Sequence, residues 1–362
     1  LLVYTNALPK NHPELVDAKK RKIPTLSYPQ TLNFISKEKY TIAISGTHGK
    51  TTTTAMVAKI LMDAKLDPTV IVGSLLKSTG SNFVGGKSDF FVVEADEYKR
   101  AFLNLEPRIL AINNLDLDHL DYYKNLKDIQ SAFRKLAEKI GANGFLICDK
   151  ENPHLKPVIK SLKCTVIHYP DVDLSNWKLK VPGEHNRQNA KAAATVAGVL
   201  GVPEANIRNS LEHFEGTWRR FEYKGETATG VLVYDDYAHN PQKVRAALSG
   251  AREMFPKKKI WIIFQPHLFS RTKSFFKEFV ESFNDADEVI FAPIFAAREA
   301  LDTSITSEML ARAVVKNGGR AHYAEMFENI VKYLKKQTKK GDVVMTVGAG
   351  DIYKVGEEFL KK

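Results

Sequence analysis

The sequence predicts an α/β protein in which parallel strands alternate with helices. From Tyr40 onward, short apolar runs are separated by segments with helical spacing of their apolar residues, as in a sheet flanked by helices. Several runs, such as Phe90–Ala95, are continuously apolar, which is expected for strands covered on both faces. A second alternating series begins after the turn-rich segment Glu215–Arg219. Two independent series predict two α/β domains with a ligand cleft between them.

The first series begins with a strand at Tyr40–Ser45, which a glycine turn at Gly46–Lys50 joins to a helix at Thr51–Ala64. The helix is indicated by apolar residues at helical spacing in TTTTAMVAKILMDA. The series continues with strands at Phe90–Ala95 and Ile109–Asn113, an amphipathic helix at Ile129–Ile140 and a strand at Gly144–Cys148.

The second series shows the same alternation in the C-terminal part of the chain. The predicted strands are Val231–Tyr234, Ile260–Phe264, Val289–Pro293 and Asp342–Val347, and the predicted helices are Pro241–Phe255, Phe275–Asn284, Ser307–Lys316 and Phe327–Gln337. Residues 1–38 precede both series and resemble the tail of a third domain. Because Leu1 lies inside a strand-like run (LLVYTNAL), we expect the natural protein to carry further residues before it.

The composition is that of a soluble globular protein, with 44% hydrophobic and 26% charged residues. The longest apolar runs are strand-length and fall short of the ~20 residues that span a bilayer. The excess of Lys and Arg over Asp and Glu gives a net charge of +11. Because these basic residues are scattered along the chain, we expect a cleft for phosphates rather than a nucleic-acid surface. Cys148 and Cys164 lie in apolar surroundings and are expected to be reduced core thiols of a cytoplasmic protein.

The strongest local signal is the segment ISGTHGKT at residues 44–51, placed between a predicted strand and a predicted helix. In this context backbone N–H groups and a helix N-terminus bind phosphates. Gly46 and Gly49 allow the backbone to approach the anion, Lys50 reaches the β- and γ-phosphates, and the Thr51 hydroxyl binds Mg²⁺. The segment therefore predicts a nucleotide-binding P-loop.

Acidic residues follow two of the predicted strands. Glu94–Glu97 (EADE) and Asn113–His119 (NNLDLDH) both emerge where α/β proteins build their sites, at the carboxyl ends of strands. Carboxylate, imidazole and hydroxyl groups at neighbouring strand ends suit a Mg²⁺ site beside a nucleotide. His is an unusual Mg²⁺ ligand, so a helix-capping Asp118 with an incidental His119 is the alternative.

In this order, GTHGKTTT, EADE and NNLDLDH resemble the central ATPase domain of the Mur ligase family. The family's loop is shortened, which accounts for Ile44 where a longer P-loop has its first glycine. The segment 183–189 (GEHNRQN) resembles the family's G-x-H-N-x-x-N element. This resemblance implies that Asn186 and Asn189 lie near the nucleotide's base and ribose.

Three further segments carry the resemblance into the second series. RRFE at 219–222 resembles the family's hinge, and the matching Arg220 is implied to contact the γ-phosphate. DDYAHNP at 235–241 resembles an element that places Asp236 and His239 at the ATP and amino-acid end of the cleft. FQPHLFSRT at 264–272 resembles a segment of the alanine-adding branch, in which His267 and Arg271 would meet the amino acid's carboxylate.

The resemblance implies a P-loop central domain with a parallel sheet at 39–215 and a Rossmann-like C-terminal α/β domain at 216–362. Residues 1–38 would be the remnant of an N-terminal UDP-substrate-binding domain. The implied catalytic residues are Lys50, Glu94, His119, Arg220 and His239, and the implied metal ligands are Thr51, Glu94 and His119. The implied ATP-binding residues are Gly46, Thr47, His48, Gly49, Lys50, Thr51, Thr52, Asn186, Asn189, Arg220 and Asp236, and the implied amino-acid-binding residues are His239, His267 and Arg271.

The implied reaction joins the carboxylate of UDP-N-acetylmuramate to L-alanine through an acyl phosphate, with ATP and Mg²⁺ as cofactors. No nucleic acid and no membrane insertion are expected, and the chain would be a monomer or a weak homodimer. Two departures keep alternatives open: Leu268 replaces an arginine of the family, and Tyr98 follows EADE. The alternatives are the family's tripeptide-recycling ligase, or a P-loop ATPase or binding protein that has lost ligase activity.

Overall fold

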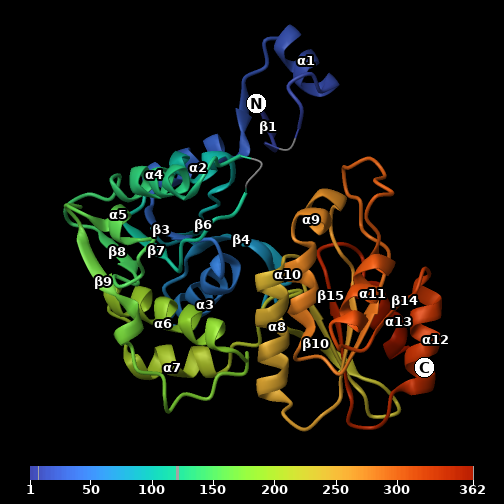
Figure 1. Cartoon of the computed structure of the whole chain (residues 1–362). Helices are drawn as coiled ribbons and strands as arrows, with labels where there is room; N and C mark the ends of the chain where they lie inside the picture. The colour runs from blue at the N-terminus through green and yellow to red at the C-terminus, as the bar shows by residue number, and fades with distance from the viewer. Residues whose placement is uncertain (7, 120–121, 362) are drawn as a thin grey trace. The chain divides into compact units, whose positions relative to one another are not determined.

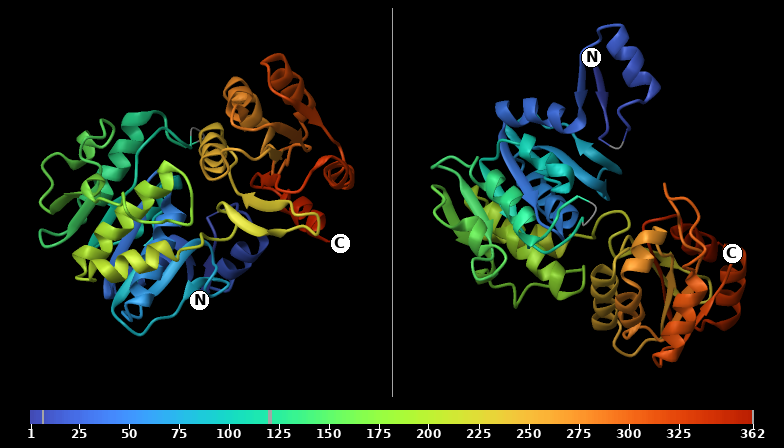
Figure 2. Two further views of the ribbon diagram at one scale, coloured as in Figure 1. Left: turned by 90° about the horizontal axis from the view of Figure 1, so that it is seen from below. Right: turned by 45° about the horizontal axis from the view of Figure 1, so that its top comes forward.

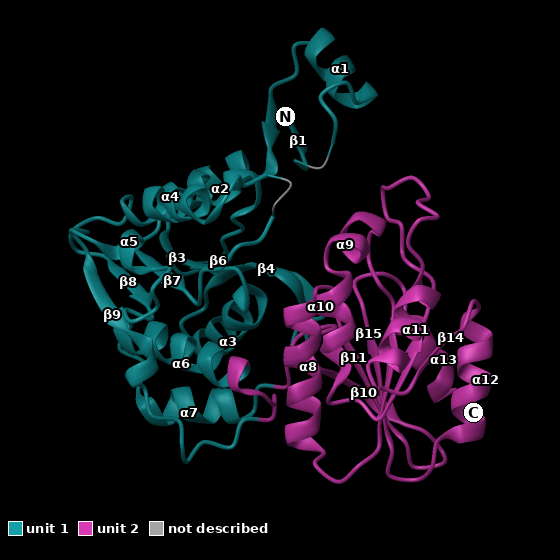
Figure 3. Cartoon of the chain, viewed as in Figure 1, with its two compact units in different colours: residues 1–179, 186–214 teal, residues 180–185, 215–362 magenta. Residues whose placement is uncertain are grey.

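The computed structural model describes residues 1–6, 8–119 and 122–361. The chain divides into two compact units (Figures 1 and 3). Unit 1 comprises Leu1–Leu179 and Asn186–Phe214, and unit 2 comprises Lys180–His185 and Glu215–Lys362. Residues 1–38 fall within unit 1, so the division of the chain into three domains stays a prediction.

The described residues of unit 1 form a seven-stranded sheet in the order β5-β4-β6-β3-β7-β8-β9. All neighbouring strands are parallel except β4 and β5, which pair antiparallel. Strand β3 is central and pairs with both β6 and β7, so the carboxyl ends of these three strands meet at one edge. The bounds are β3 Tyr40–Ser45, β4 Thr69–Leu76, β5 Ser81–Val84, β6 Phe90–Glu94, β7 Ile109–Ile112, β8 Phe145–Cys148 and β9 Thr165–His168.

Helices cover both faces of this sheet, which explains why strands such as β7 are apolar at every position. Leu32 of α2 (Tyr28–Glu38) and Phe133 of α4 (Leu126–Ala137) share a core with Phe91 and Leu110 of the sheet. Helix α3 (Lys50–Asp63) lies on the opposite face (Figure 1). The remaining helical segments are η1 Tyr98–Asn104, α5 Lys156–Ile159, η2 Tyr169–Asp171, α6 Glu184–Val199 and α7 Glu204–Glu212.

The first residues of unit 1 form a small separate sheet. Strands β1 (Leu2–Tyr4) and β2 (Thr25–Ser27) pair in parallel, and α1 (Pro13–Lys20) lies between them in the chain. None of the helices in the described part of the chain combines the length and the apolar character that a transmembrane span requires.

The described residues of unit 2 form a six-stranded sheet in the order β10-β11-β15-β12-β13-β14, parallel except for the pair β10 and β11. Helices α8, α10 and α11 pack on one face, and α12 and α13 pack on the other (Figure 2). The strands are β10 Glu222–Glu226, β11 Leu232–Asp236, β12 Ile260–Phe264, β13 Glu288–Phe291, β14 Ala321–Tyr323 and β15 Val343–Val347. The helical segments are α8 Pro241–Met254, α9 Phe269–Ser274, α10 Phe276–Val280, η3 Glu281–Phe283, α11 Ser307–Lys316, α12 Phe327–Gln337 and α13 Tyr353–Leu360.

The α/β fold class predicted from the sequence is confirmed. The predicted strands at Tyr40–Ser45 and Ile260–Phe264 and the helix at Ser307–Lys316 have the predicted bounds. The helix expected at Phe275–Asn284 is instead divided into α10 and η3. Local chemistry fixes some boundaries: the Asn240 side chain accepts the Lys243 N–H at 2.9 Å, which caps α8.

Candidate functional site

The loop between β3 and α3 requires glycine at two positions. Gly46 and Gly49 have φ of 129° and 82°, in the left-handed region that favours glycine. A Cβ at Gly49 would lie 2.1 Å from the Asn189 side-chain oxygen, so no larger residue fits. The His48 N–H donates to Asn114 Oδ1 at 2.8 Å, which fixes the loop against the segment after β7. The result is a preformed loop at the N-terminus of a 14-residue helix, the setting in which proteins bind phosphates.

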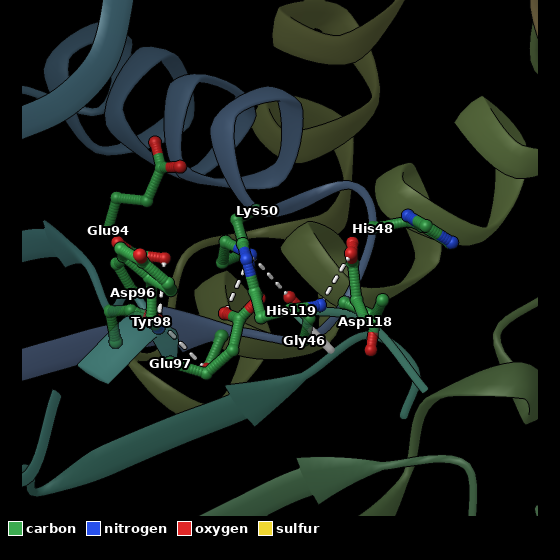
Figure 4. A network of polar contacts seen from close by, with 12 residues as sticks. Gly46, His48, Lys50, Glu94, Asp96, Glu97, Tyr98, Asp118 and His119 are labelled. Carbon is green, nitrogen blue, oxygen red and sulfur yellow. Dashed lines mark hydrogen bonds and ion pairs between the residues drawn. The ribbon is translucent and has the colours of Figure 1, made fainter. Parts of the chain in front are cut away.

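Lys50 at the start of α3 is held by a buried carboxylate. Its Nζ donates to the two oxygens of Glu97 at 2.7 and 2.9 Å and to the carbonyl of Gly46 at 2.8 Å (Figure 4). The Glu97 side chain is completely buried. Burial alone would raise its pKa, but the Lys50 ammonium and the hydrogen bonds from His119 and Lys50 lower the pKa of Glu97 to about 2. Glu97 is therefore an anion whose charge is balanced by the Lys50 ammonium.

His119 lies against the same carboxylate. Its Nε2 is 3.3 Å from Glu97 Oε1. Asp96, Glu97 and His119 each offer one atom that could bind a metal ion, and these three atoms lie within 4.8 Å of one another. Burial lowers the pKa of His119, but the hydrogen bond to Glu97 and the neighbouring carboxylates outweigh it and raise the pKa above its usual value. The Asp118 side chain accepts the His119 N–H at 2.8 Å, so it fixes the local turn that presents the imidazole.

Glu94 has different partners from Glu97. Thr51 Oγ1 donates to Glu94 Oε1 at 3.0 Å, and the Gly73 N–H donates to Glu94 Oε2 at 2.7 Å. Figure 4 shows the Glu94 carboxylate apart from the group formed by Lys50, Glu97 and His119. The structure thus pairs Thr51 with Glu94, and His119 with Glu97. Of the EADE segment, the sequence analysis selected Glu94 as a metal ligand and did not select Glu97, which the structure places against Lys50 and His119.

Buried amides connect α6 to the loop. Asn113 Nδ2 donates to Thr53 Oγ1 at 2.8 Å and to Asn189 Oδ1 at 3.2 Å, and Asn189 Nδ2 donates to Asn186 Oδ1 at 3.3 Å. The structure therefore places Asn186 and Asn189 beside the loop, as expected for residues near a nucleotide. Asn113 was not among the expected site residues, although NNLDLDH contains it. Thr47 and Thr52, which the sequence also selected, are buried in the loop and in the first turn of α3.

The two adjacent arginines of unit 2 have different environments. Arg219 is buried, and it donates from Nε to Asp235 at 2.7 Å and from Nη1 to the Gly350 carbonyl at 2.7 Å. The guanidinium groups of Arg219 and Arg220 both lie over the ring of Tyr237, 5.1 and 5.3 Å from its centroid, but Arg220 is only partly buried. Arg219 is thus part of the scaffold, whereas Arg220 is the one whose guanidinium lies outside this buried network.

Asp236 lies beside Arg220 at the end of β11. It accepts the N–H groups of Phe221 at 2.7 Å and Ala238 at 2.8 Å. Burial raises its pKa, while the Arg220 charge and these hydrogen bonds oppose the rise. The carboxylate therefore organises the chain on both sides of the strand end.

Two histidines and an arginine form a second group in unit 2. The rings of His239 and His267 are 6.1 Å apart, and Arg271 Nη1 lies 3.1 Å from His267 Nδ1. Burial, followed by the charges of nearby Lys243 and Arg271, lowers the pKa of His239 well below its ordinary value. Burial and Arg271 likewise lower the pKa of His267. Both imidazoles are therefore neutral at pH 7, and the group offers one guanidinium and two polar rings to a small anion.

Together, the fold and the loop define a P-loop protein of the ATP-dependent ligase class. The family model described as the Mur ligase middle domain matches residues 44–177, and the one described as the Mur ligase, glutamate ligase domain, matches residues 219–350. The chain belongs to the Mur ligase family.

Curated relatives extend this likeness over the whole chain. The chain is 42% identical to the UDP-N-acetylmuramate–L-alanine ligase of Clostridium kluyveri, with 100% of this chain and 85% of the relative covered. The protein of the same name from Clostridium acetobutylicum is 41% identical, with 100% of this chain and 84% of the relative covered.

Solved structures of the family share the fold. The UDP-N-acetylmuramate–alanine ligase of Thermotoga maritima is similar with a TM-score of 0.81 and 28% identity, covering 99% of this chain and 83% of that one. A murein peptide ligase of Psychrobacter arcticus is similar with a TM-score of 0.68 and 23% identity, covering 98% and 84%, which shows a shared fold alone. The family and the enzyme class expected from the sequence are confirmed.

Proposed function

We propose that this chain joins L-alanine to the carboxylate of UDP-N-acetylmuramate with consumption of ATP, a step in the synthesis of peptidoglycan precursors. The observation that carries the proposal is the identity of about 42% over the whole chain to curated relatives that bear this name. The arrangement of Lys50, Glu97 and His119 at the P-loop supports it, because a ligase must bind and activate a nucleoside triphosphate.

The residues at the loop fit a divalent cation. Glu97 is a buried anion, and a divalent cation could replace the Lys50 ammonium that neutralises it in the ligand-free chain. Asp96 and His119 bring further donor atoms to the same place, and carboxylate oxygens are preferred ligands of Mg²⁺. We assign Glu97, His119 and Thr51 to hold Mg²⁺, with Glu94 orienting the Thr51 hydroxyl. Mg²⁺ would neutralise charge on the phosphates of ATP.

The remaining residues of unit 1 would bind the nucleotide. Backbone N–H groups of the loop, from Gly46 to Thr52, would donate to the phosphates, with Lys50 at the β- and γ-phosphates. The amides of Asn186 and Asn189 would contact the base and ribose, since they lie against the loop through Asn113.

Residues of unit 2 would act on the transferring group and on the incoming amino acid. Arg220 would stabilise charge on the γ-phosphoryl group, with Asp236 fixing the segment that carries it. Arg271 and His267 would bind the carboxylate of L-alanine. Burial lowers the pKa of His239, so its neutral imidazole can accept a hydrogen bond from the amine.

The reaction proceeds in two transfers. A carboxylate oxygen of UDP-N-acetylmuramate attacks the γ-phosphorus, the bond to the β-phosphate oxygen breaks, and ADP leaves. The neutral amine of L-alanine then attacks the carbonyl carbon of the acyl phosphate, and inorganic phosphate leaves as the amide forms. The attacking nitrogen loses one proton in this step, and the proton leaves with the inorganic phosphate as hydrogen phosphate. The protein's contribution is chiefly positioning and charge stabilisation.

Phosphate release from ATP and Mg²⁺ tests the proposal, with UDP-N-acetylmuramate and either single amino acids or the recycled tripeptide. We expect release that requires both UDP-N-acetylmuramate and L-alanine. Lys50→Met is expected to lower the rate by about 100- to 1000-fold, as for other electrostatic donors at active sites. Lys59→Met is the matched control, because Lys59 lies on the same helix but pairs only at the surface with Asp63.

Two outcomes would contradict the proposal. A response to the tripeptide alone would indicate the recycling ligase, which the Tyr98 after EADE favours. Release that ignores both acceptor substrates would indicate an ATPase that has lost ligase activity.

We also propose a cytoplasmic monomer or weak homodimer. Cys148 and Cys164 form no disulfide and are buried, and burial raises the pKa of Cys148 to about 12, as suits a reduced compartment. Sedimentation of the purified chain over a range of concentrations tests the oligomeric state, and a stable higher oligomer would contradict it.

A further inference from the structure

The two segments that carry the expected cation ligands leave their strands in strained conformations. Glu97 follows β6, and His119 follows β7, on either side of the central strand β3. Lys99, Arg100 and His119 have φ of 51°, 59° and 55°, in the left-handed region that non-glycine residues rarely adopt. Such conformations are unfavourable and persist only where surrounding contacts impose them.

One contact runs from the Glu97 segment to His119. The ring of Tyr98 lies on the His119 imidazole, with centroids 4.8 Å apart and planes tilted by 39° (Figure 4). Tyr98 also meets the edge of Tyr122 at 6.2 Å. Tyr98, the neighbour of Glu97 in the chain, thus limits the rotation of the His119 side chain.

A second contact runs in the opposite direction. The hydroxyl of Tyr123, on the His119 segment, donates to the backbone carbonyl of Glu97 at 2.6 Å. Tyr123 is almost fully buried, and the Arg100 guanidinium lies 5.5 Å from its ring centroid. Arg100 in turn pairs with Asp128 at 2.6 Å, in the first turn of α4. The backbone that carries Glu97 is therefore fixed by the segment that carries His119.

We propose that Tyr98 and Tyr123 are positioning residues that tie the two ligand segments to each other, each tyrosine fixing the ligand residue of the opposite segment. The identity of the cation as Mg²⁺ rests on the proposed function. Both tyrosines act through Glu97 and His119, so their effect is on cation binding.

Each tie can be removed separately. Tyr123→Phe deletes one hydroxyl and leaves the Glu97 carbonyl with only the Arg100 N–H, 2.9 Å away, of these two donors, while the buried ring stays in place. Tyr98→Ala removes the ring that covers His119, whereas Tyr98→Phe keeps it. Because outer contacts to metal ligands are typically worth 10- to 100-fold in metal affinity, we expect about tenfold weaker binding from each loss.

The test is a titration of the full chain with Mn²⁺, followed by electron paramagnetic resonance in the presence of a non-hydrolysable ATP analogue. Tyr98→Ala and Tyr123→Phe are expected to weaken Mn²⁺ binding about tenfold, and Tyr98→Phe to bind like the unmodified chain. Tyr40→Ala is the matched control, because Tyr40 packs on Phe90 in the same unit but at the start of β3, away from the loop. In ligase assays, the Mg²⁺ concentration for half-maximal rate should rise, while the rate at saturating Mg²⁺ changes little.

Mn²⁺ affinities within twofold of the unmodified chain for both Tyr98→Ala and Tyr123→Phe would overturn the proposal. An equal loss in Tyr98→Phe and Tyr98→Ala would overturn the role of the Tyr98 ring. If Tyr98→Ala does not fold, Tyr123→Phe decides the outcome, since it removes a single atom. These binding measurements need no acceptor substrate, so the proposed ligase activity can fail in its own assay without affecting them.

Discussion

Replacing Arg219 by methionine should destabilise unit 2 strongly. The side chains of Arg219 and Asp235 are 3% and 1% exposed, and their Nε and Oδ2 atoms are 2.7 Å apart. Arg219 also donates to the carbonyls of Gly348 and Gly350. Methionine keeps much of the apolar stem but removes the charge and every donor. Breaking one side of a buried ion pair costs about 3–5 kcal/mol, because the other charge stays buried and uncompensated.

The loss should depend on pH in a defined direction. Burial, opposed by Arg219, raises the pKa of Asp235 to about 6, and removing Arg219 raises it further. A carboxyl group with a raised folded-state pKa contributes stability fully below its unfolded value, near 4, and loses that contribution as the pH rises through the folded value. The deficit of Arg219→Met is therefore expected to be smallest near pH 5 and to grow toward pH 8.

Urea denaturation at both pH values measures this deficit. Trp177 lies in unit 1, whereas Trp218 and Trp261 lie in unit 2. In a Trp177→Phe background, tryptophan fluorescence therefore reports unit 2 alone. Arg312→Met is the control, because its surface pair with Glu308 is exposed and contributes at most about 0.5 kcal/mol. A deficit below about 1 kcal/mol, or one that is equal at both pH values, would refute this reasoning.

Three further predictions concern the loop, acid stability and a helix cap. Gly49→Ala should abolish nucleotide binding, because the added Cβ would lie 2.1 Å from Asn189 Oδ1. Titration with an ATP analogue measures the dissociation constant, and a value near that of the unmodified chain would contradict this prediction. Lys50 and other partners lower the pKa of Glu97 to about 2 against the opposing effect of burial, so this group contributes stability above about pH 4.5 and loses it as the pH falls toward 2. When the metal-free protein is titrated with acid, the circular-dichroism signal of Glu97→Gln should decline less steeply with falling pH than that of the unmodified chain. Identical slopes would be evidence against this contribution of Glu97. Asn240→Ala should lower the stability of unit 2 by about 1 kcal/mol through loss of the α8 cap, and unchanged urea unfolding would exclude that role.

The sequence predicted the elements whose residues are buried on both sides. Strand β12 is apolar at every position, and β3 has an apolar centre directly before the glycine turn, so their bounds could be read from the sequence. Strand β10 was missed because it lies at the edge of its sheet and has the polar sequence EYKGE, with no residue fully buried. Edge strands of this kind are defined by pairing with a neighbour rather than by a hydrophobic pattern.

The P-loop could also be predicted from the sequence, because two glycines, a lysine and a threonine have fixed spacing there. Which glutamate of EADE meets Lys50 could not be predicted, since it depends on how the chain turns after β6. The same applies to Arg219 and Arg220: neighbouring residues of one type differ only in which of them points into the core. Side-chain direction at a turn is a property of the folded backbone, and periodicity does not encode it there.

The ion pair between Lys50 and Glu97 has a consequence for the order of ligand binding. In the ligand-free protein the lysine is a tethered counterion, so a divalent cation that arrives alone must compete with a cation that never diffuses away. A nucleotide that draws Lys50 to its phosphates removes this competitor and opens the Glu97 carboxylate. By reciprocity, a cation held at Glu97 releases Lys50 for the nucleotide, so each ligand strengthens binding of the other. We therefore expect Mn²⁺ to bind far more weakly to the free chain than to the nucleotide complex, and equal affinities would exclude this exchange.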